Sequence, residues 1–186
     1  VFMMKMFYEG NPQDQFNLLK QSLASVKSSY DALLQEHTKI HKELFQRVRL
    51  DLGAGKDRLL SNEQLLADVK RKGMSPALAE RMFNYGRYLL IASTNPNGLP
   101  ANLQGVWNGM YSPPWQGSFF LNENLQMNYW QALQGNMPEL LLSVFNLIEG
   151  AMPDFRTNAK RYFGTRGILF PIRMIPSYGL KTKALT

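Results

Sequence analysis

The stretch Gly98–Trp130, GLPANLQGVWNGMYSPPWQGSFFLNENLQMNYW, is the part of the chain around which the other elements are arranged. Helical periodicity is weak in it until its last residues, and the pairs Leu99-Pro100 and Pro113-Pro114 favour turns. Irregular segments of this length are uncommon in a compact domain unless they line a site. We therefore expect the functional site to lie here.

The residue types in this stretch indicate what such a site would bind. It holds all three tryptophans of the chain, and side-chain amides lie between them. Flat aromatic faces interleaved with amides suit a sugar ring, which has apolar C–H faces and a rim of hydroxyls. The predicted sugar-facing wall consists of Asn102, Gln104, Trp107, Asn108, Trp115, Asn128 and Trp130.

Outside this stretch, apolar residues recur at spacings of three and four, which predicts helices. The expected helices are Pro12 to Val26, Tyr30 to about Asp51, a short one within 53–73, Ser75 to Ile91, Leu125 to Asn136, 137–150 and Pro153 to Phe163. Asn11 and Ser75 are expected N-caps. The helix after Ser75 is apolar nearly all round, so we expect it to be buried. Residues 168–175 are predicted to be a strand or extended return, and the class is all-α with long ordered loops.

Composition limits the class of protein further. The 21 Lys and Arg against 14 Asp and Glu give a net charge of +7, but these residues are scattered among apolar and acidic neighbours, so solvated helix faces are favoured over a nucleic-acid partner. The chain has no cysteine and no apolar run long enough for a membrane span. It starts with Val and ends in a polar tail, which suggests a piece of a longer protein.

Two histidines, His37 and His41, share one helix face at the spacing of a zinc-binding helix. No third ligand is apparent in the sequence. We therefore expect these histidines to pack between helices, each hydrogen-bonded to a neighbour, rather than to bind zinc. No metal or cofactor is predicted.

The sequence Asn122-Glu123-Asn124 offers two interpretations. In extended chain entering a helix, residues two apart point the same way, so Asn122 and Asn124 would present neighbouring amides. Such a pair can orient a water molecule if a carboxylate nearby supplies the charge and a separate acid protonates the leaving group. The alternative, which residue types alone favour, is that both asparagines cap the following helix.

Several linked motifs resemble those of the glycoside hydrolase family 95 α-L-fucosidases. They are Phe45–Gly53, Tyr85–Ile91, Leu99–Asn108, Pro113–Trp115, Asn122–Asn124 and Met127–Trp130, and the likeness covers roughly His37 to Gly167. The resemblance implies an all-α chain that is a portion of an (α/α)6 barrel, the six-hairpin toroid. It also implies that 1–36 are N-terminal linker helices and 37–186 the N-terminal part of the catalytic domain.

The resemblance further implies inverting hydrolysis of terminal α-L-fucosyl, or α-L-galactosyl, linkages in fucosylated glycans, with Asn122 and Asn124 positioning the attacking water. The family's general acid Glu and supporting Asp fall downstream of Thr186, so this chain alone is expected to be inactive. Helices of an incomplete barrel lack partners and expose apolar stripes, so the chain is also expected to self-associate or to be buried against another chain. No membrane or nucleic-acid partner is implied, and a periplasmic or extracellular parent protein is favoured.

Two departures from the family pattern bear on specificity. Glu123 stands where many members have an apolar residue, and residues 168–173 replace a histidine-rich stretch that contacts substrate. The sugar and linkage therefore stay open. A non-catalytic carbohydrate-binding or scaffold protein is the alternative function, and an α-helical nucleic-acid binder is the least favoured.

Overall fold

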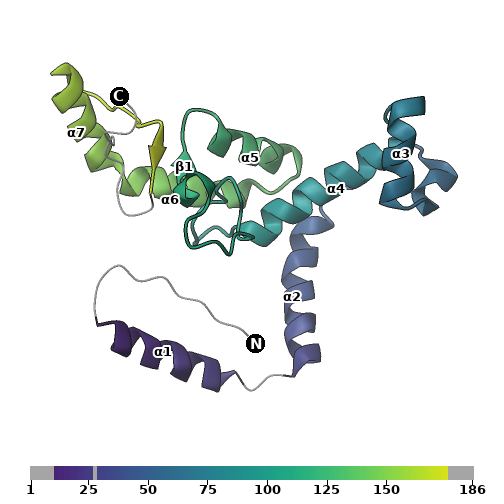
Figure 1. The fold of residues 1–186 in the computed structure, drawn as a ribbon, viewed down its shortest axis with the longest axis horizontal. Helices are drawn as coiled ribbons and strands as arrows, with labels where there is room; N and C mark the ends of the chain where they lie inside the picture. Colours follow the sequence, from purple (N-terminus) through teal and green to yellow (C-terminus); the bar gives the residue numbers. More distant parts are fainter. Residues whose placement is uncertain (1–10, 27–28, 176–186) are drawn as a thin grey trace. The chain divides into compact units, whose positions relative to one another are not determined.

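The computed structural model describes residues 11–26 and 29–175. The chain divides into two compact units, Val1–Ile40 and His41–Thr186, and the second contains every candidate site residue. The elements, in chain order (Figure 1), are α1 (Pro12–Ser25), α2 (Tyr30–Phe45), η1 (Gly55–Leu59), α3 (Asn62–Lys72), α4 (Pro76–Ser93), η2 (Pro114–Gly117), β1 (Phe119–Phe120), α5 (Asn124–Gln134), η3 (Pro138–Leu141), α6 (Leu142–Gly150), α7 (Met152–Phe163) and β2 (Arg173–Met174).

The predicted all-α class is confirmed, since helices dominate the described residues and fit a portion of an (α/α)6 barrel. Strands β1 and β2 form a short antiparallel pair in which Phe119 faces Met174, so the return expected over 168–175 is a strand at its end. Among the described residues, no helix combines the length and apolar character needed to cross a bilayer. The domain boundary at 36/37 stays a prediction.

The expected starts of two helices are confirmed. The Asn11 side chain accepts a hydrogen bond from the Gln13 amide at 2.8 Å, and Pro12 follows at the first helical position. Ser75 Oγ accepts from the Leu78 amide at 3.2 Å at the start of α4. Helix α1, in the first unit, has no buried residue.

Helix α2 ends at Phe45, six residues before the Asp51 that the apolar spacing indicated. The reason is Arg87 of α4, which is fully buried and donates to the carbonyls of Leu44, Phe45 and Val48 at 3.2, 2.6 and 2.8 Å. A cation that binds the last carbonyls of a helix satisfies groups that would otherwise need another helical turn. The chain can therefore leave the helix without unpaired carbonyls.

The main core joins the helices around the 94–118 segment to the strand pair. It is built from Leu90, Ala101, Phe119, Leu125, Tyr129, Ala132, Met137, Leu140, Leu147, Ala151, Phe155 and Met174. A smaller cluster of Ala54, Leu65, Ala77 and Leu78 packs α3 against the start of α4. The expectation that α4 is buried all round is wrong for one face, because Met82 and Tyr85 are more than half exposed.

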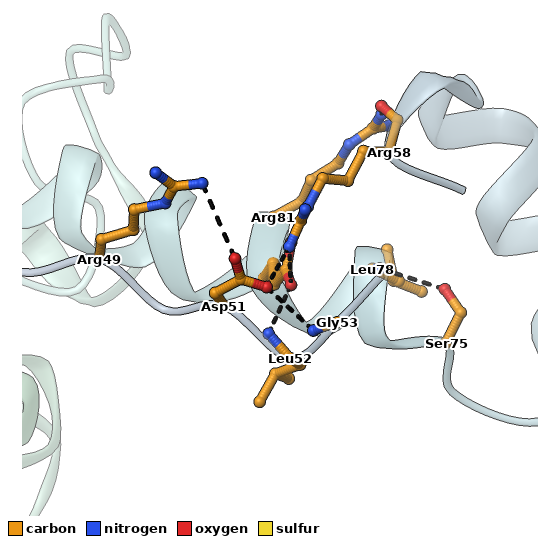
Figure 2. A network of polar contacts seen from close by, with 9 residues as sticks. Arg49, Asp51, Leu52, Gly53, Arg58, Ser75, Leu78 and Arg81 are labelled. Atoms are coloured by element: carbon orange, nitrogen blue, oxygen red, sulfur yellow. Dashed lines mark hydrogen bonds and ion pairs between the residues drawn. The ribbon is translucent and has the colours of Figure 1, made fainter. Parts of the chain in front are cut away.

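Helix α4 is tied to the preceding chain by a charged network (Figure 2). Arg58 binds Glu80 in a bidentate way, with both hydrogen bonds at 2.8 Å, and also donates to Asp51. The Leu52 amide donates to Glu80 at 2.6 Å, and the Gly53 amide donates to Asp51 at 2.9 Å. Glu80 is buried, and its two oxygens have charged or amide donors, so the cost of its burial is offset.

We expect Glu80→Gln to flatten the dependence of stability on acid pH. Hydrogen bonds from Arg58 and then from Leu52 lower the pKa of Glu80 to about 2 from 4.5. Because the pKa is lower in the folded state, the ionised carboxylate stabilises the fold above about pH 4.5, and this stabilisation is lost as pH falls toward 2. Thermal melting midpoints across this interval should therefore fall less in Glu80→Gln than in the unmodified chain.

The matched control for that measurement is Glu149→Gln, since Glu149 is an exposed residue near the end of α6. It should leave the acid slope of the melting midpoint unchanged. Equal slopes for Glu80→Gln and Glu149→Gln would show that the network does not carry the pH dependence.

The two histidines stand in separate units, His37 in the first and His41 in the second. The His41 ring lies 5.5 Å from the ring of Phe45 and 5.5 Å from that of Tyr88, which agrees with the packing role expected for it. Within the described ranges, no set of three or more His, Asp or Glu side chains is arranged to hold a metal ion.

Candidate functional site

A pocket of about 350 Å³ lies between α4, α5 and the segment that follows α4. It is lined by Gly86, Leu89, Leu90, Ser93, Ala101, Asn102, Leu103, Gln104, Gly105, Trp107, Met127, Asn128 and Gln131. Of the predicted wall, Asn102, Gln104, Trp107 and Asn128 are therefore brought together. The pocket joins a tryptophan to several amides, the combination expected for a sugar site.

Hydrogen bonds from α5 hold the segment that lines the pocket. The Ala101 amide donates to the Tyr129 hydroxyl at 2.9 Å, and that hydroxyl lies 3.1 Å from Ser143 Oγ in the core. Asn128 Nδ2 donates to the carbonyl of Asn102 at 3.1 Å. An irregular segment can keep one conformation when its buried backbone groups are paired in this way.

The side chain of Asn102, which lines the pocket, makes two hydrogen bonds within the loop. Its Nδ2 donates to the Gly117 carbonyl at 3.1 Å, and its Oδ1 accepts from the Gln104 amide at 2.9 Å. Gln104 Nε2 in turn donates to the Pro114 carbonyl at 3.3 Å. These bonds connect the first half of the irregular segment to the second, so Asn102 and Gln104 also stabilise the conformation of the segment that lines the pocket.

Trp107 is held against Gly105. Gly105 has φ +58°, and a Cβ placed on it would come 2.5 Å from Cζ3 of the Trp107 ring. Only a residue without a side chain allows both this backbone conformation and this approach. Trp107 as a whole is 54% exposed, and it packs on the glycine while it also lines the pocket.

Replacing Gly105 by Ala is expected to displace the Trp107 ring and to destabilise the fold by roughly 1–2 kcal/mol, the usual cost of a left-handed non-glycine residue. Urea unfolding measures the loss, and the Trp107 fluorescence maximum, isolated by subtracting the Trp107→Phe variant, reports the displacement. Gly109→Ala is the control, because a Cβ there meets nothing within 4 Å. Indistinguishable Gly105 and Gly109 variants would contradict the packing described.

The other predicted wall residues do not line the pocket. Asn108 Oδ1 accepts from the Met110 amide at 2.7 Å and closes a local turn. Trp115 and Trp130 are 63% and 62% exposed. Trp115 and Gln116 both have positive φ, 52° and 59°, a conformation that non-glycine residues adopt at a cost. Whether these side chains contact sugar stays a prediction.

Asn122 and Asn124 lie at the start of α5. The chain is extended only over Phe119–Phe120 and then turns, so the premise that extended chain continues to Asn124 is wrong. The capping alternative is also wrong, because the N-cap is Glu123 and makes no side-chain capping bond. Among the described residues, neither asparagine amide has a hydrogen-bond partner, so both are available to solvent or ligand.

Helix geometry connects Asn124 to the pocket. Residues four and three apart lie on the same face of a helix, so Asn124, Asn128 and Gln131 form one polar stripe along α5. The last two line the pocket, and Asn124 lies one turn beyond Asn128. Asn124 and the two amides that line the pocket therefore lie along the same face of this helix.

Most pocket residues were not among the predicted site residues, and Ser93, Met127 and Gln131 are examples. The spacing of Asn124, Asn128 and Gln131 was the signal available for Gln131. None of the described residues that line the pocket is charged, so it offers neither a proton donor nor a charged base.

Comparison with known proteins gives one consistent assignment. Residues 29–176 match the glycosyl hydrolase family 95 catalytic domain. The chain is 39% identical over 145 residues to Alpha-L-fucosidase 2 of Arabidopsis thaliana, covering 76% of this chain and 17% of that protein. It is 36% identical over 152 residues to Probable alpha-fucosidase A of Aspergillus niger, covering 80% of this chain and 19% of that protein.

A second Aspergillus protein, Probable alpha-fucosidase A of Aspergillus oryzae, is 33% identical over 152 residues, which cover 80% of this chain and 21% of that protein. The chain thus spans about a fifth of the length of the curated relatives it matches. Because the family match covers most of the sequence, the chain belongs to glycosyl hydrolase family 95, as part of its catalytic domain.

Proposed function

We propose that this chain is the water-positioning part of an inverting glycoside hydrolase that removes terminal α-L-fucosyl, or α-L-galactosyl, residues from glycans. The observation that carries the proposal is the pocket lined by Trp107, Gln104 and Asn128, on the α5 face that continues to Asn124. The names of the relatives, Alpha-L-fucosidase 2 and Probable alpha-fucosidase A, support the choice of sugar.

The mechanism assigns one task to the residues of this chain. Asn122 and Asn124 hold a water molecule through its hydrogens and direct its lone pair at the anomeric carbon, while the pocket holds the sugar. An amide is too weak a base to take the proton, so a carboxylate must supply the charge and a general acid must protonate the leaving oxygen. In inverting enzymes these two carboxyl functions stand roughly 6.5–9.5 Å apart across the sugar.

Neither carboxyl function is matched by an acidic residue of this chain. Glu139 accepts a hydrogen bond from Arg47 at 2.6 Å, and Glu149 is exposed near the end of α6. We therefore expect the 186 residues alone to release no fucose from an aryl α-L-fucoside. Measurable release of fucose would contradict the proposal that the proton donor is not among these residues.

A chimera tests the function itself. Residues 41–175 replace the corresponding segment of Alpha-L-fucosidase 2 of Arabidopsis thaliana, and hydrolysis of 4-nitrophenyl α-L-fucoside is measured. Activity with release of β-L-fucose, observed by proton NMR before mutarotation, supports the proposal. A chimera that folds, as judged by circular dichroism and melting, but does not hydrolyse the substrate argues against it.

The uncharged lining of the pocket favours one alternative, a carbohydrate-binding role without catalysis. Measuring both L-fucose binding and aryl-fucoside hydrolysis by the chimera distinguishes the binding role from the catalytic role. A folded chimera that binds L-fucose without hydrolysing the aryl fucoside would favour the binding role.

A further inference from the structure

The short helix η2 holds its tryptophan in a strained backbone conformation. Trp115 and Gln116 have φ of 52° and 59°, and Gly117, at 62°, continues the left-handed run. The Gln116 amide donates to the Pro113 carbonyl at 2.9 Å. Non-glycine residues adopt this region at a cost, and they stay there only where the surrounding structure determines the conformation. Contacts from outside η2 must therefore stabilise it.

Two side chains of the pocket wall supply these contacts. Asn102 Nδ2 donates to the Gly117 carbonyl at 3.1 Å, and Gln104 Nε2 donates to the Pro114 carbonyl at 3.3 Å. The first bond holds the end of η2 and the second holds its start. Because Asn102 and Gln104 both line the pocket, η2 is attached directly to the pocket wall.

Core packing does not account for the strain at Trp115. The residue is 63% exposed and belongs to neither core cluster. It also lies outside the set of residues that line the pocket. A strained conformation that presents a large apolar side chain to solvent, next to a pocket, is typical of a position that contacts a ligand.

Two other exposed aromatic residues fit this role less well. Tyr111 is fully exposed, and it follows Gly109, where an added Cβ would meet nothing within 4 Å, so its loop is not packed against the wall. Trp130 lies on α5, where it is turned by about 200° from Asn128 and about 100° from Gln131, the residues that line the pocket. Trp115 is the one of the three that is attached to the pocket wall.

We propose that Trp115 is the platform for the sugar to which the terminal fucosyl residue is linked, and that it favours oligosaccharides over fucosides with a small leaving group. Asn102 and Gln104 are positioning residues for this platform. The inference rests on the proposed function, because it takes the pocket to hold the terminal sugar. The next sugar then lies outside the pocket, where its apolar C–H face can stack on the indole, and a ring that is already held in place loses little entropy on binding.

The test compares two substrates that share the fucosyl group and differ in the leaving group. The leaving group of α-L-fucosyl fluoride is one atom and cannot stack, whereas that of α-L-fucosyl-(1→2)-galactose is a pyranose. In the chimera, Trp115→Ala should lower the ratio of kcat/KM for the disaccharide to kcat/KM for the fluoride by about threefold to tenfold, the effect of one aromatic contact. Trp115→Phe, which keeps a ring, should restore most of this ratio. An unchanged ratio in Trp115→Ala would overturn the proposal.

The matched control is Tyr111→Ala, which removes an exposed aromatic ring from the same irregular segment. The ratio of the two kcat/KM values should stay the same in this variant. A general loss of stability would lower both rates together and would not change the ratio. If Trp115→Ala and Tyr111→Ala change the ratio equally, Trp115 is not the platform.

Binding to the 186-residue chain separates this inference from the proposed function. The indole N–H signals of the three tryptophans are assigned by NMR of the single Trp→Phe variants. The disaccharide should shift the signals of Trp107 and Trp115, and L-fucose that of Trp107 alone; a Trp115 signal that the disaccharide leaves in place would contradict the inference. If the folded chimera hydrolyses neither substrate but the disaccharide shifts the Trp115 signal, the hydrolase assignment fails and the inference holds. If the chimera hydrolyses both and Trp115→Ala leaves the ratio unchanged, the inference fails and the hydrolase assignment holds.

Discussion

Arg87→Met is expected to lower the free energy of unfolding of the second unit by roughly 3–5 kcal/mol, because three carbonyls lose their donor at roughly 1–3 kcal/mol each while the burial cost of the guanidinium is relieved. Arg87 is 0% exposed and donates to three backbone carbonyls at the end of α2 and just beyond. Its guanidinium also lies over the rings of Phe45 and Phe83, at 4.9 and 5.6 Å. Methionine fills part of the volume but leaves the carbonyls without donors.

Burial lowers the pKa of Arg87, but arginine starts so high that it stays charged at neutral pH. The helix dipole adds to the effect, because the positive group stands where α2 ends. Loss of Arg87 therefore removes a hydrogen-bonding cap and a favourable charge together. The helix end would have to fray or recruit water.

Urea unfolding followed by circular dichroism measures the change. With a slope of roughly 1–3 kcal/mol per molar urea, the midpoint should fall by at least about 1 M. The urea midpoint of Arg87→Lys should lie between those of the unmodified chain and Arg87→Met, since an ammonium cannot span three carbonyls as a planar guanidinium can. Arg71→Met is the control: its side chain is 74% exposed and forms an ion pair with the half-buried Asp68, which also pairs with Lys72, so its effect should stay below about 1 kcal/mol. An Arg87→Met variant as stable as Arg71→Met would disprove the capping role.

The comparison of sequence and structure shows which features local pattern can predict. The caps at Asn11 and Ser75 were predictable because capping depends on neighbours two or three residues away. The end of α2 was not, because it depends on Arg87, which is some forty residues further along the chain. Periodicity continues through Val48 on the apolar side, and nothing local to that segment marks the carbonyls that α4 satisfies.

The same limit applies to the candidate site. The amide and tryptophan composition located the segment, and Asn102, Gln104, Trp107 and Asn128 do meet at one pocket. Sequence could not tell which groups hold the Gln131 and Gln104 amides, because these are the carbonyls of Gly86 and Pro114, which are remote from their donors. The way these two amides are held is thus a property of the tertiary structure.

The largest functional effect is expected at the start of α5. In the chimera, Asn124→Ala should lower kcat by roughly 10²–10⁴, the usual contribution of a group that prepares the proton-transfer step, and should leave KM nearly unchanged because Asn124 holds the water and not the sugar. Asn122→Ala should behave in the same way. Gln134→Ala, at an exposed amide near the end of the same helix, is the control and should retain full activity.

The double variant Asn122→Ala/Asn124→Ala distinguishes a shared water site from two independent roles. If both amides hold one water molecule, loss of either already releases it, so the double variant should be about as slow as the slower single variant. Independent contributions would instead multiply, and the double variant would fall by the product of the two single losses. Steady-state rates on the aryl fucoside measure this difference, and multiplicative losses would rule out a common water molecule at the head of α5.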